Sequence, residues 1–273
     1  MDSQSLAPAS GRHIGENRRF CCATLYDAPF AYLGDLALST LIQYARHHGF
    51  DLAHADSAPS DRPLPWHKIL MIDELFRCGY ECVFWMDADA ILLDLQQDIR
   101  DILEAGKDFY LVRHRMDGRE TPNTGVMLAR NTPWTRSLLK QIWAQDQYID
   151  HAWWENAALI HLLCGSEFAD ADIVNRGEPL SQEKIKWLDE AWNVLPRFSK
   201  TSRCHVKHFA GESPEIRRAG MEPANRRLLR LQQRVLYRFA PLRGASFPIR
   251  LLRPRWRRAS NTPPPPRSST KAA

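Results

Sequence analysis

The sequence predicts an α/β protein built on a mainly parallel, Rossmann-like sheet. Strand-length apolar runs alternate with longer stretches in which apolar residues recur at helical spacing, and this alternation is typical of βαβ units. The 273 residues are 44% hydrophobic and 25% charged, values that are ordinary for a globular protein with a buried core. We therefore expect one large α/β domain with appendages.

The first half of the chain gives the clearest alternation. Gly49 and Gly79 are placed to end two helices, and Pro65 suits the first turn of the second. The expected elements are a strand at 19–26, a helix at 33–48, a strand at 50–55, a helix at 65–78, an apolar strand at 82–93 and a short helix at 95–105.

The second half continues the pattern as far as residue 210. Thr132-Pro133 caps a helix that carries apolar residues on one side. The expected elements are strands at 108–112 and 124–129, that helix, a helix at 155–164, and strands at 186–188 and 205–209. Beyond residue 210, apolar residues at helical spacing are interleaved with arginines at 225–239, and the stretch 247–258 combines apolar residues with five arginines, so we expect helices there too.

The charge is divided along the chain. Residues 221–273 hold 13 Lys and Arg against one acidic residue, a net charge of +12, whereas the remainder carries −7 of the total of +5. No run approaches eighteen apolar residues, so we expect no transmembrane helix, and the polar start of the chain lacks the apolar stretch of a signal peptide. Six scattered cysteines without zinc-ligand spacing fit reduced thiols in a cytoplasmic protein.

Two aspartates interrupt the apolar run at 82–93. Asp87 and Asp89 are one residue apart, and in an extended chain such residues point the same way. A buried carboxylate is costly unless it is hydrogen-bonded, paired or bound to a metal. The run therefore predicts a divalent-metal site at the carboxyl end of a strand, where open α/β sheets place their ligands.

Two other interpretations of this motif remain open. Asp-x-Asp also occurs by chance as a turn or cap on a solvated loop. Phosphatases of the haloacid-dehalogenase type also carry Asp-x-Asp after an apolar strand. Their motif, however, normally continues with Thr or Val and lies near the amino terminus, whereas Ala90 follows here.

Five motifs in a fixed order resemble one family. They are Trp66-His67-Lys68, the run from Phe84 to Ile91, Asn123-Thr124-Gly125-Val126, Trp154-Glu155-Asn156-Ala157, and His208-Phe209-Ala210-Gly211. Together they resemble the retaining galactosyl/xylosyltransferase family typified by xyloglucan xylosyltransferases and galactomannan galactosyltransferases, over residues 18–212. The resemblance implies the GT-A fold, a UDP-sugar donor, Mn²⁺ and retention of anomeric configuration.

The resemblance also implies the site residues. Asp87, Asp89 and His208 would hold the metal, and Glu155 with Asn156 would act in catalysis, the carboxylate stabilising oxocarbenium-like charge. Asn156 departs from the family, whose amide here is usually Gln. The donor would be bound by Tyr26, Asp27, Lys68, Asp87, Ala88, Asn123, Thr124, Gly125 and Gly211.

Each assignment has a structural alternative. Lys68 could be a solvated helix lysine or pair within the site, and Asp27 could be a turn residue. His208 could be a structural histidine, and Glu155 could simply favour a helix N-terminus. The Asn123–Gly125 motif could be a plain turn and strand entry.

The resemblance sets the limits of the catalytic domain, and charge and composition set those of the C-terminal segments. We expect a flexible N-terminus at 1–17, a GT-A catalytic domain at 18–212, a basic amphipathic helical segment at 213–260 and a disordered Pro-rich tail at 261–273. The basic segment could bind anionic lipid, bind nucleic acid or dock on the catalytic domain, and we favour the membrane surface.

The sequence thus predicts a cytoplasmic enzyme, peripheral on the inner face of the membrane, that transfers galactose or xylose from a UDP-sugar to a glycan or glycolipid. Two alternatives are an inactive GT-A scaffold that binds membrane or nucleic acid, and a metal-dependent phosphatase.

Overall fold

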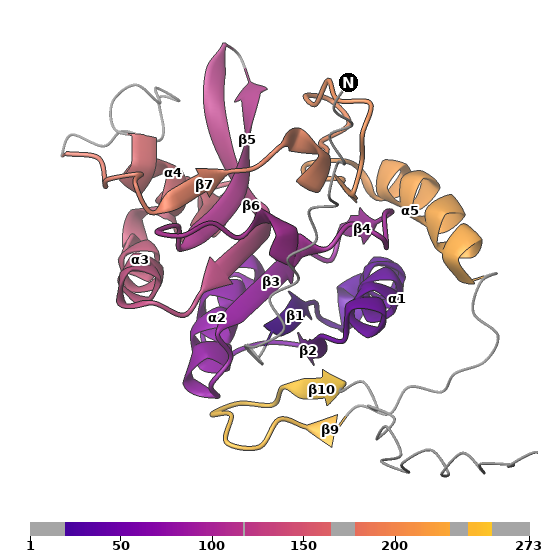
Figure 1. Cartoon of the computed structure of the whole chain (residues 1–273), viewed down its shortest axis with the longest axis horizontal. Helices are drawn as coiled ribbons and strands as arrows, with labels where there is room; N and C mark the ends of the chain where they lie inside the picture. The colour runs from indigo at the N-terminus through magenta and orange to yellow at the C-terminus, as the bar shows by residue number, and fades with distance from the viewer. Residues whose placement is uncertain (1–19, 117, 165–177, 230–239, 253–273) are drawn as a thin grey trace, which may run out of the picture.

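A mixed eight-stranded sheet organises the chain. The computed structural model describes residues 20–116, 118–164, 178–229 and 240–252 (Figure 1). The expectations for residues 1–17 and 261–273 lie outside these ranges. The strands are β1 (Phe20–Leu25), β2 (Asp51–Ala55), β3 (Cys82–Met86), β4 (Ala90–Leu92), β5 (Phe109–Met116), β6 (Arg119–Arg130), β7 (Ile185–Trp187), β8 (Val206–His208), β9 (Ala240–Pro241) and β10 (Arg250–Leu252). The helices are α1 (Ala31–His48), α2 (His67–Arg77), α3 (Pro133–Trp143), α4 (Trp154–Cys164) and α5 (Pro214–Leu229).

The strand order is β7-β5-β6-β3-β1-β2-β10-β9, with β4 and β8 forming a separate small sheet. In the large sheet β1 is parallel to both β2 and β3, and β7 is parallel to β5 at one edge. By contrast, β6 runs antiparallel to both of its neighbours, and so do the pairings of β10. The predicted α/β fold is confirmed, and the three adjacent parallel strands β2, β1 and β3 precede the aspartates in the chain.

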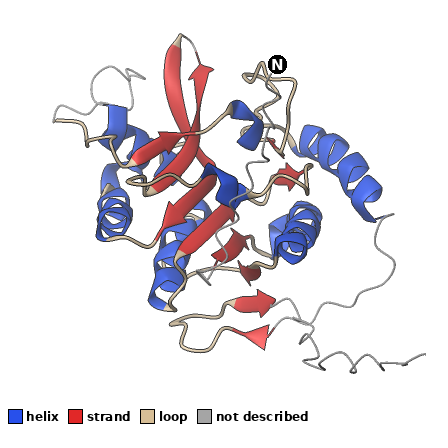
Figure 2. Ribbon diagram, viewed as in Figure 1, coloured by secondary structure: helices blue, strands red, loops and turns tan. Residues whose placement is uncertain are grey.

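Helices cover both faces of the sheet (Figure 2). Side chains from α2, α3 and α4 form one apolar cluster with the sheet, and side chains from α1 and α5 form the other. The strands β1 and β3 are buried along their whole length, which explains why both read as continuous apolar runs. Gly49 ends α1 in the left-handed conformation with φ 75°, as its position predicts.

Two expected elements differ from the structure. The short helix expected at 95–105 is a 3₁₀ turn at Ile99–Ile102, begun by the carboxylate of Asp98 accepting from the Arg100 N–H at 2.9 Å. The acidic strand expected at 82–93 is two strands, because β3 ends at Met86 and β4 begins at Ala90. The aspartates therefore lie in the connecting turn, and their proximity does not come from an extended backbone.

The described part of the basic C-terminal segment is only partly helical. Helix α5 is followed, after residues 230–239 outside the described ranges, by the hairpin β9–β10, whose second strand lies antiparallel beside β2 (Figure 1). Leu251 and Leu252 are buried in opposite apolar clusters. The helix expected from residue 247 is wrong up to residue 252, because β2 would otherwise expose unpaired backbone groups at the edge of the sheet.

The hairpin is also held by a buried carboxylate. Glu74 of α2 accepts hydrogen bonds from the backbone N–H of Ser246 at 2.6 Å and from its hydroxyl at 2.8 Å. Because Ile249, Leu251 and Leu252 are buried, their side chains are not available to a bilayer. Among the described residues, no helix is both long enough and apolar enough to cross a membrane.

Candidate active site

The turn between β3 and β4 fixes the two aspartates through backbone hydrogen bonds. The N–H of Asp87 donates to the carbonyl of Gly125 at 2.7 Å, and the N–H of Ala90 donates to the carbonyl of Asp87 at 3.0 Å. The carbonyl of Asp89 accepts from the N–H of Phe209 at 3.0 Å. The turn is thus tied to β6 on one side and to the end of β8 on the other, at the carboxyl end of β3 as predicted.

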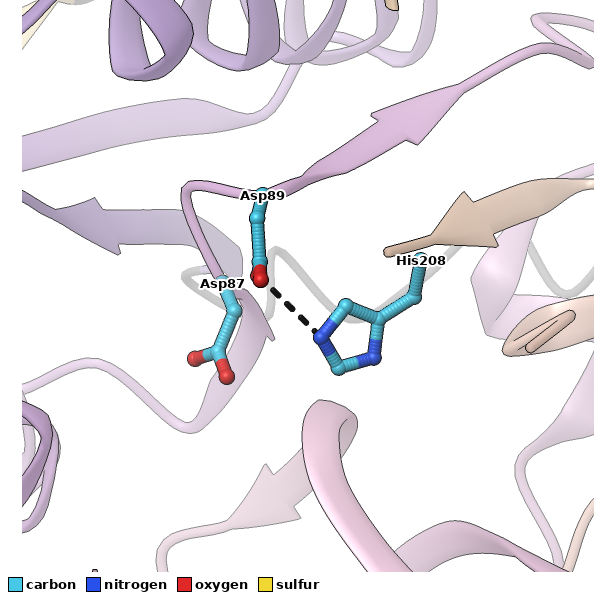
Figure 3. Close-up of side chains that lie close together, drawn as sticks. All are labelled: Asp87, Asp89 and His208. Atoms are coloured by element: carbon cyan, nitrogen blue, oxygen red, sulfur yellow. Dashed lines mark ion pairs between the residues drawn. The ribbon is translucent and has the colours of Figure 1, made fainter. Parts of the chain in front are cut away.

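Three side chains converge at this turn (Figure 3). Asp87, Asp89 and His208 each offer a ligand atom, and these atoms lie within 4.8 Å of one another. His208 arrives through the pairing of β4 with β8, in which it faces Ala90. Its Nε2 lies 3.1 Å from Oδ1 of Asp89. The fold therefore brings together the three residues to which the resemblance assigns the metal.

Asp89 also contacts a guanidinium. Nη2 of Arg217, in the first turns of α5, lies 3.1 Å from Oδ2 of Asp89, and Nε of Arg217 donates to the carbonyl of Phe209 at 3.2 Å. Burial raises the pKa of the Asp89 carboxyl, but His208 and Arg217 outweigh it and lower that pKa to about 2. Asp89 is therefore an anion in the folded protein at neutral pH.

Lys68 is buried between two carboxylates. Its Nζ lies 2.7 Å from Oδ1 of Asp87 and 2.8 Å from Oε1 of Glu155, and 4% of its side chain is exposed. Burial opposes its charge, yet the two carboxylates raise the pKa of Lys68 above its ordinary value. The solvated-lysine alternative is wrong, because the first turns of α2 direct this side chain into the site.

Glu155 occupies the opposite side of that lysine. Its Oε1 accepts a hydrogen bond from the hydroxyl of Thr124 at 3.0 Å. Its Oε2 is buried and has no hydrogen-bond partner among the described residues. Burial raises the pKa of Glu155, the Asp87 charge acts in the same direction, and Lys68 opposes both. An unpartnered carboxylate oxygen beside a buried ammonium is costly for a merely structural residue, which favours a functional one.

The Asn123–Gly125 motif lies at an irregularity of the β5–β6 ladder. Leu111 pairs with Met127, but the next residue of β5 pairs with Asn123, so a bulge falls on the motif. A Cβ built on Gly125 would lie 2.0 Å from the His208 ring. Glycine is therefore required here because the imidazole packs directly on the backbone of β6. Turn-and-strand geometry alone would not impose this requirement.

Helix α4 is joined to the same motif. The backbone N–H of Thr124 donates to Oδ1 of Asn156 at 2.9 Å. This contact anchors the start of α4 to β6, and it engages the side-chain oxygen of a residue to which the resemblance assigns a catalytic role. Trp154, just before Glu155, has a φ of 44°, a left-handed conformation that is uncommon for a residue with a side chain.

Tyr26 and Asp27, two of the residues expected to bind the donor, have local partners. The Tyr26 hydroxyl donates to Oδ1 of Asp35 at 2.6 Å, and its ring packs against Gly34, where a Cβ would lie 2.3 Å away. Asp27 caps the following 3₁₀ turn, with Oδ1 accepting from the Phe30 N–H at 3.2 Å. Asp27 is thus a turn residue as well as a candidate, and the donor-binding roles of both residues stay predictions.

Two further candidates sit at turns beside the metal ligands. Ala88 is buried between the aspartates, and Gly211, three residues after His208, has a φ of 68°. Their contribution to donor binding stays a prediction.

Three residues that sequence reasoning missed complete the site. The indole N–H of Trp85 donates to Oδ1 of Asp87 at 2.7 Å. Oδ1 of Asn193 lies 3.0 Å from Nδ1 of His208. Arg217 contacts Asp89 from a helix that begins after the motifs end. Only Trp85 carried a signal, because it stands two residues before Asp87 in the same apolar run.

Comparison with known proteins agrees with this geometry. Residues 34–107 match the model of the galactosyl transferase GMA12/MNN10 family. A glycosyltransferase involved in glycosylation of the major capsid of PBCV-1 is similar in structure, with TM-score 0.56 and 14% identity over 75% of this chain and 98% of that one. The chain is a glycosyltransferase of the GT-A fold. The prediction of a GT-A glycosyltransferase is thereby confirmed, and the match over residues 34–107 agrees with the galactosyltransferase family that the motifs resemble.

Two further structures show the same fold. The galactosyltransferase LgtC, solved with donor and acceptor sugar analogs, has TM-score 0.51 and 12% identity over 79% of this glycosyltransferase and 97% of its own chain. The glycosyltransferase GlyE of Streptococcus pneumoniae has TM-score 0.50 and 12% identity over 75% of this chain and 60% of its own. A comparison with curated protein sequences finds no match.

The residues of this glycosyltransferase fit a divalent cation. Two carboxylates and one imidazole converge, which is a donor set suited to a transition metal such as Mn²⁺. Nε2 of His208 and Oδ1 of Asp89 are 3.1 Å apart, a spacing compatible with two neighbouring ligands of one ion. The acidic cluster thus supports a metal site formed by Asp87, Asp89 and His208.

Proposed function

We propose that this enzyme transfers galactose or xylose from a UDP-sugar to a glycan or glycolipid acceptor, with Mn²⁺ and with retention of configuration. One observation carries the proposal. The candidate metal ligand Asp87 and the carboxylate of Glu155 are bridged by one buried ammonium, that of Lys68. The candidate metal site, where the diphosphate would bind, and the carboxylate that would face the sugar are therefore separated by one side chain, that of Lys68.

The charges of the site match a departing diphosphate. When bound, Mn²⁺ would supply positive charge to the leaving group. Lys68 and Arg217 are the fixed cations beside the ligands Asp87 and Asp89, and they would offset the remaining negative charge. The Arg217 guanidinium is also 5.8 Å from the ring of Phe30, in the turn that Asp27 caps, so Arg217 would lie close to a residue predicted to bind the donor.

Glu155 would act on the sugar. As the bond between the anomeric carbon and the phosphate oxygen breaks, positive charge develops on the ring, and a carboxylate held in a buried site stabilises that charge. The acceptor oxygen then forms its bond to the same carbon, and its proton passes to the leaving phosphate. This front-face course needs no covalent nucleophile.

The test is release of UDP from UDP-galactose and UDP-xylose with and without Mn²⁺. We expect Mn²⁺-dependent release that is lost in Asp89→Asn. Asp108→Asn is the matched control, because Asp108 is buried but, within the described part of the chain, forms ion pairs only with Lys184 and Arg130, at 3.9 Å each. No UDP release from either donor, or equal release by Asp89→Asn, would contradict the proposal.

Peripheral placement on the inner face of a membrane also stays a prediction. We propose that arginines of the C-terminal region would attract anionic lipid. Flotation with anionic and neutral vesicles tests this, and equal recovery with both would contradict it.

A further inference from the structure

A chain of hydrogen bonds leads from the backbone of β6 to the imidazole of His208. It begins at the N–H of Gly125, which can only donate. This N–H lies 2.9 Å from the side-chain amide of Asn123, so the atom that faces it must be the oxygen Oδ1. The orientation of the Asn123 amide is therefore decided by chemistry.

Asn193 transmits this orientation. Its side-chain amide lies 2.8 Å from Oδ1 of Asn123, and because that oxygen only accepts, Asn193 must present its NH₂ group there. The oxygen of Asn193 then faces Nδ1 of His208 at 3.0 Å. An oxygen that only accepts requires a hydrogen on Nδ1, so the proton of a neutral His208 belongs on that nitrogen.

The consequence appears at the other ring nitrogen. With the proton on Nδ1, Nε2 of a neutral ring carries a lone pair, and it lies 3.1 Å from the carboxylate of Asp89. Without the relay, the ring would prefer to place its proton on Nε2 and donate it to Asp89, and such a nitrogen cannot bind a metal. The carboxylate of Asp89 thus favours the tautomer with hydrogen on Nε2, whereas the two asparagines favour the tautomer with hydrogen on Nδ1.

Burial makes the relay effective. Asn193 has no exposed surface and His208 is 2% exposed, so water does not compete for these groups. Gly125 also lets the imidazole lie directly on β6, where its orientation is fixed by contact.

We propose that the backbone N–H of Gly125, Asn123 and Asn193 form a relay that holds His208 in the tautomer whose Nε2 is available to a divalent cation. The proposal rests on the proposed function only in taking His208 as a metal ligand. It makes Asn123 and Asn193 positioning residues and gives the Asn-Thr-Gly motif a role at the metal.

The direct test is the tautomer of His208 in the metal-free protein at about pH 8. Long-range ¹H–¹⁵N spectra of protein labelled at histidine distinguish a hydrogen on Nδ1 from one on Nε2, and loss of signals in His208→Gln identifies this ring. We expect hydrogen on Nδ1. Hydrogen on Nε2 in the unaltered protein would overturn the proposal without any substitution.

Substitutions then test the relay, with Mn²⁺ affinity measured by electron paramagnetic resonance. Asn193→Leu should shift hydrogen to Nε2 and weaken Mn²⁺ binding about 10- to 100-fold. Asn193→Asp keeps an acceptor for Nδ1 and should preserve the tautomer. Asn123→Asp keeps both acceptor contacts and should bind Mn²⁺ no more weakly than the unaltered protein.

The control is Asn131→Leu, which removes hydrogen bonds to the carbonyls of Phe76 and Tyr80 outside the site. It should lower stability without changing the tautomer or Mn²⁺ affinity. Unchanged tautomer and affinity in Asn193→Leu would overturn the relay. If the unaltered protein did not bind Mn²⁺, the proposed function would fail, while the tautomer spectrum would still decide the hydrogen-bond relay.

Discussion

Lys68 and Glu155 form an ion pair of 2.8 Å in the interior, with 4% and 3% of their side chains exposed. The lysine comes from α2 and the glutamate from α4, and Asp87 completes the group from the turn after β3. A buried pair of this kind is weak evidence for stability, because desolvation offsets much of the attraction. Its position between the candidate metal ligands and Oε2 of Glu155 favours a role in function.

Removing Lys68 alone should destabilise the protein more than removing the charges of Lys68 and Glu155 together. We expect Lys68→Met to lower the free energy of unfolding by about 3–5 kcal/mol, because two carboxylates lose their buried partner. Adding Glu155→Gln should restore part of this loss. Urea unfolding of the four proteins of the cycle measures the coupling, and strictly additive effects would show that the pair is not coupled.

Glu155→Gln alone tests the role in catalysis. Glutamine retains the shape and an oxygen that accepts from Thr124, so donor affinity should change little. The loss of negative charge facing the sugar should lower kcat by about 100- to 1,000-fold. Steady-state kinetics with the active donor separate the two effects. Thr124→Val, which removes the hydroxyl that donates to Glu155, is the companion variant. For Glu155→Gln, a rise in donor KM with normal kcat would refute the catalytic role assigned to Glu155.

Gly125→Ala should displace His208. A Cβ at this position would lie 2.0 Å from the imidazole carbon Cε1, so the ring must move away from the aspartates. We expect Mn²⁺ affinity to fall at least tenfold, because the loss of one ligand of three removes a substantial part of the binding energy. Gly106→Ala is the control, since its φ of 81° makes alanine strained while no atom lies within 4 Å of the added carbon. Equal Mn²⁺ affinity in both variants would contradict the packing argument.

His114 on β5 should make the protein less stable in mild acid. Burial, with the His208 charge, lowers its pKa from 6.5 to about 4. As the pH falls, the unfolded chain therefore takes up the proton first, so stability is complete above about pH 6.5 and declines toward about pH 4. The contribution amounts to about 3 kcal/mol. Urea unfolding at both limits should show a smaller decline for His114→Gln, and identical declines would show that His114 does not titrate in this way.

The sequence by itself determined the order and type of the elements around the site. Continuous apolar runs predicted β1 and β3, helical spacing with terminal glycines predicted α1 and α2, and Thr132-Pro133 predicted the start of α3. These signals are local, because a strand buried along its whole length is a continuous apolar run, and a helix with one buried face has apolar residues at helical spacing. The Asp-x-Asp motif could be recognised for the same local reason, because burying two carboxylates within an apolar run costs free energy unless they are paired or bind a metal.

Only the tertiary structure decided which partners meet. Nothing local indicates that Arg217 reaches Asp89, that Asn193 faces His208, or that Lys68 is shared by Asp87 and Glu155, because each contact joins residues that are at least 15 positions apart. The hairpin at 240–252 is a further example. The helix expected from residue 247 is replaced by a strand at the edge of β2, whose backbone groups a helix could not have satisfied.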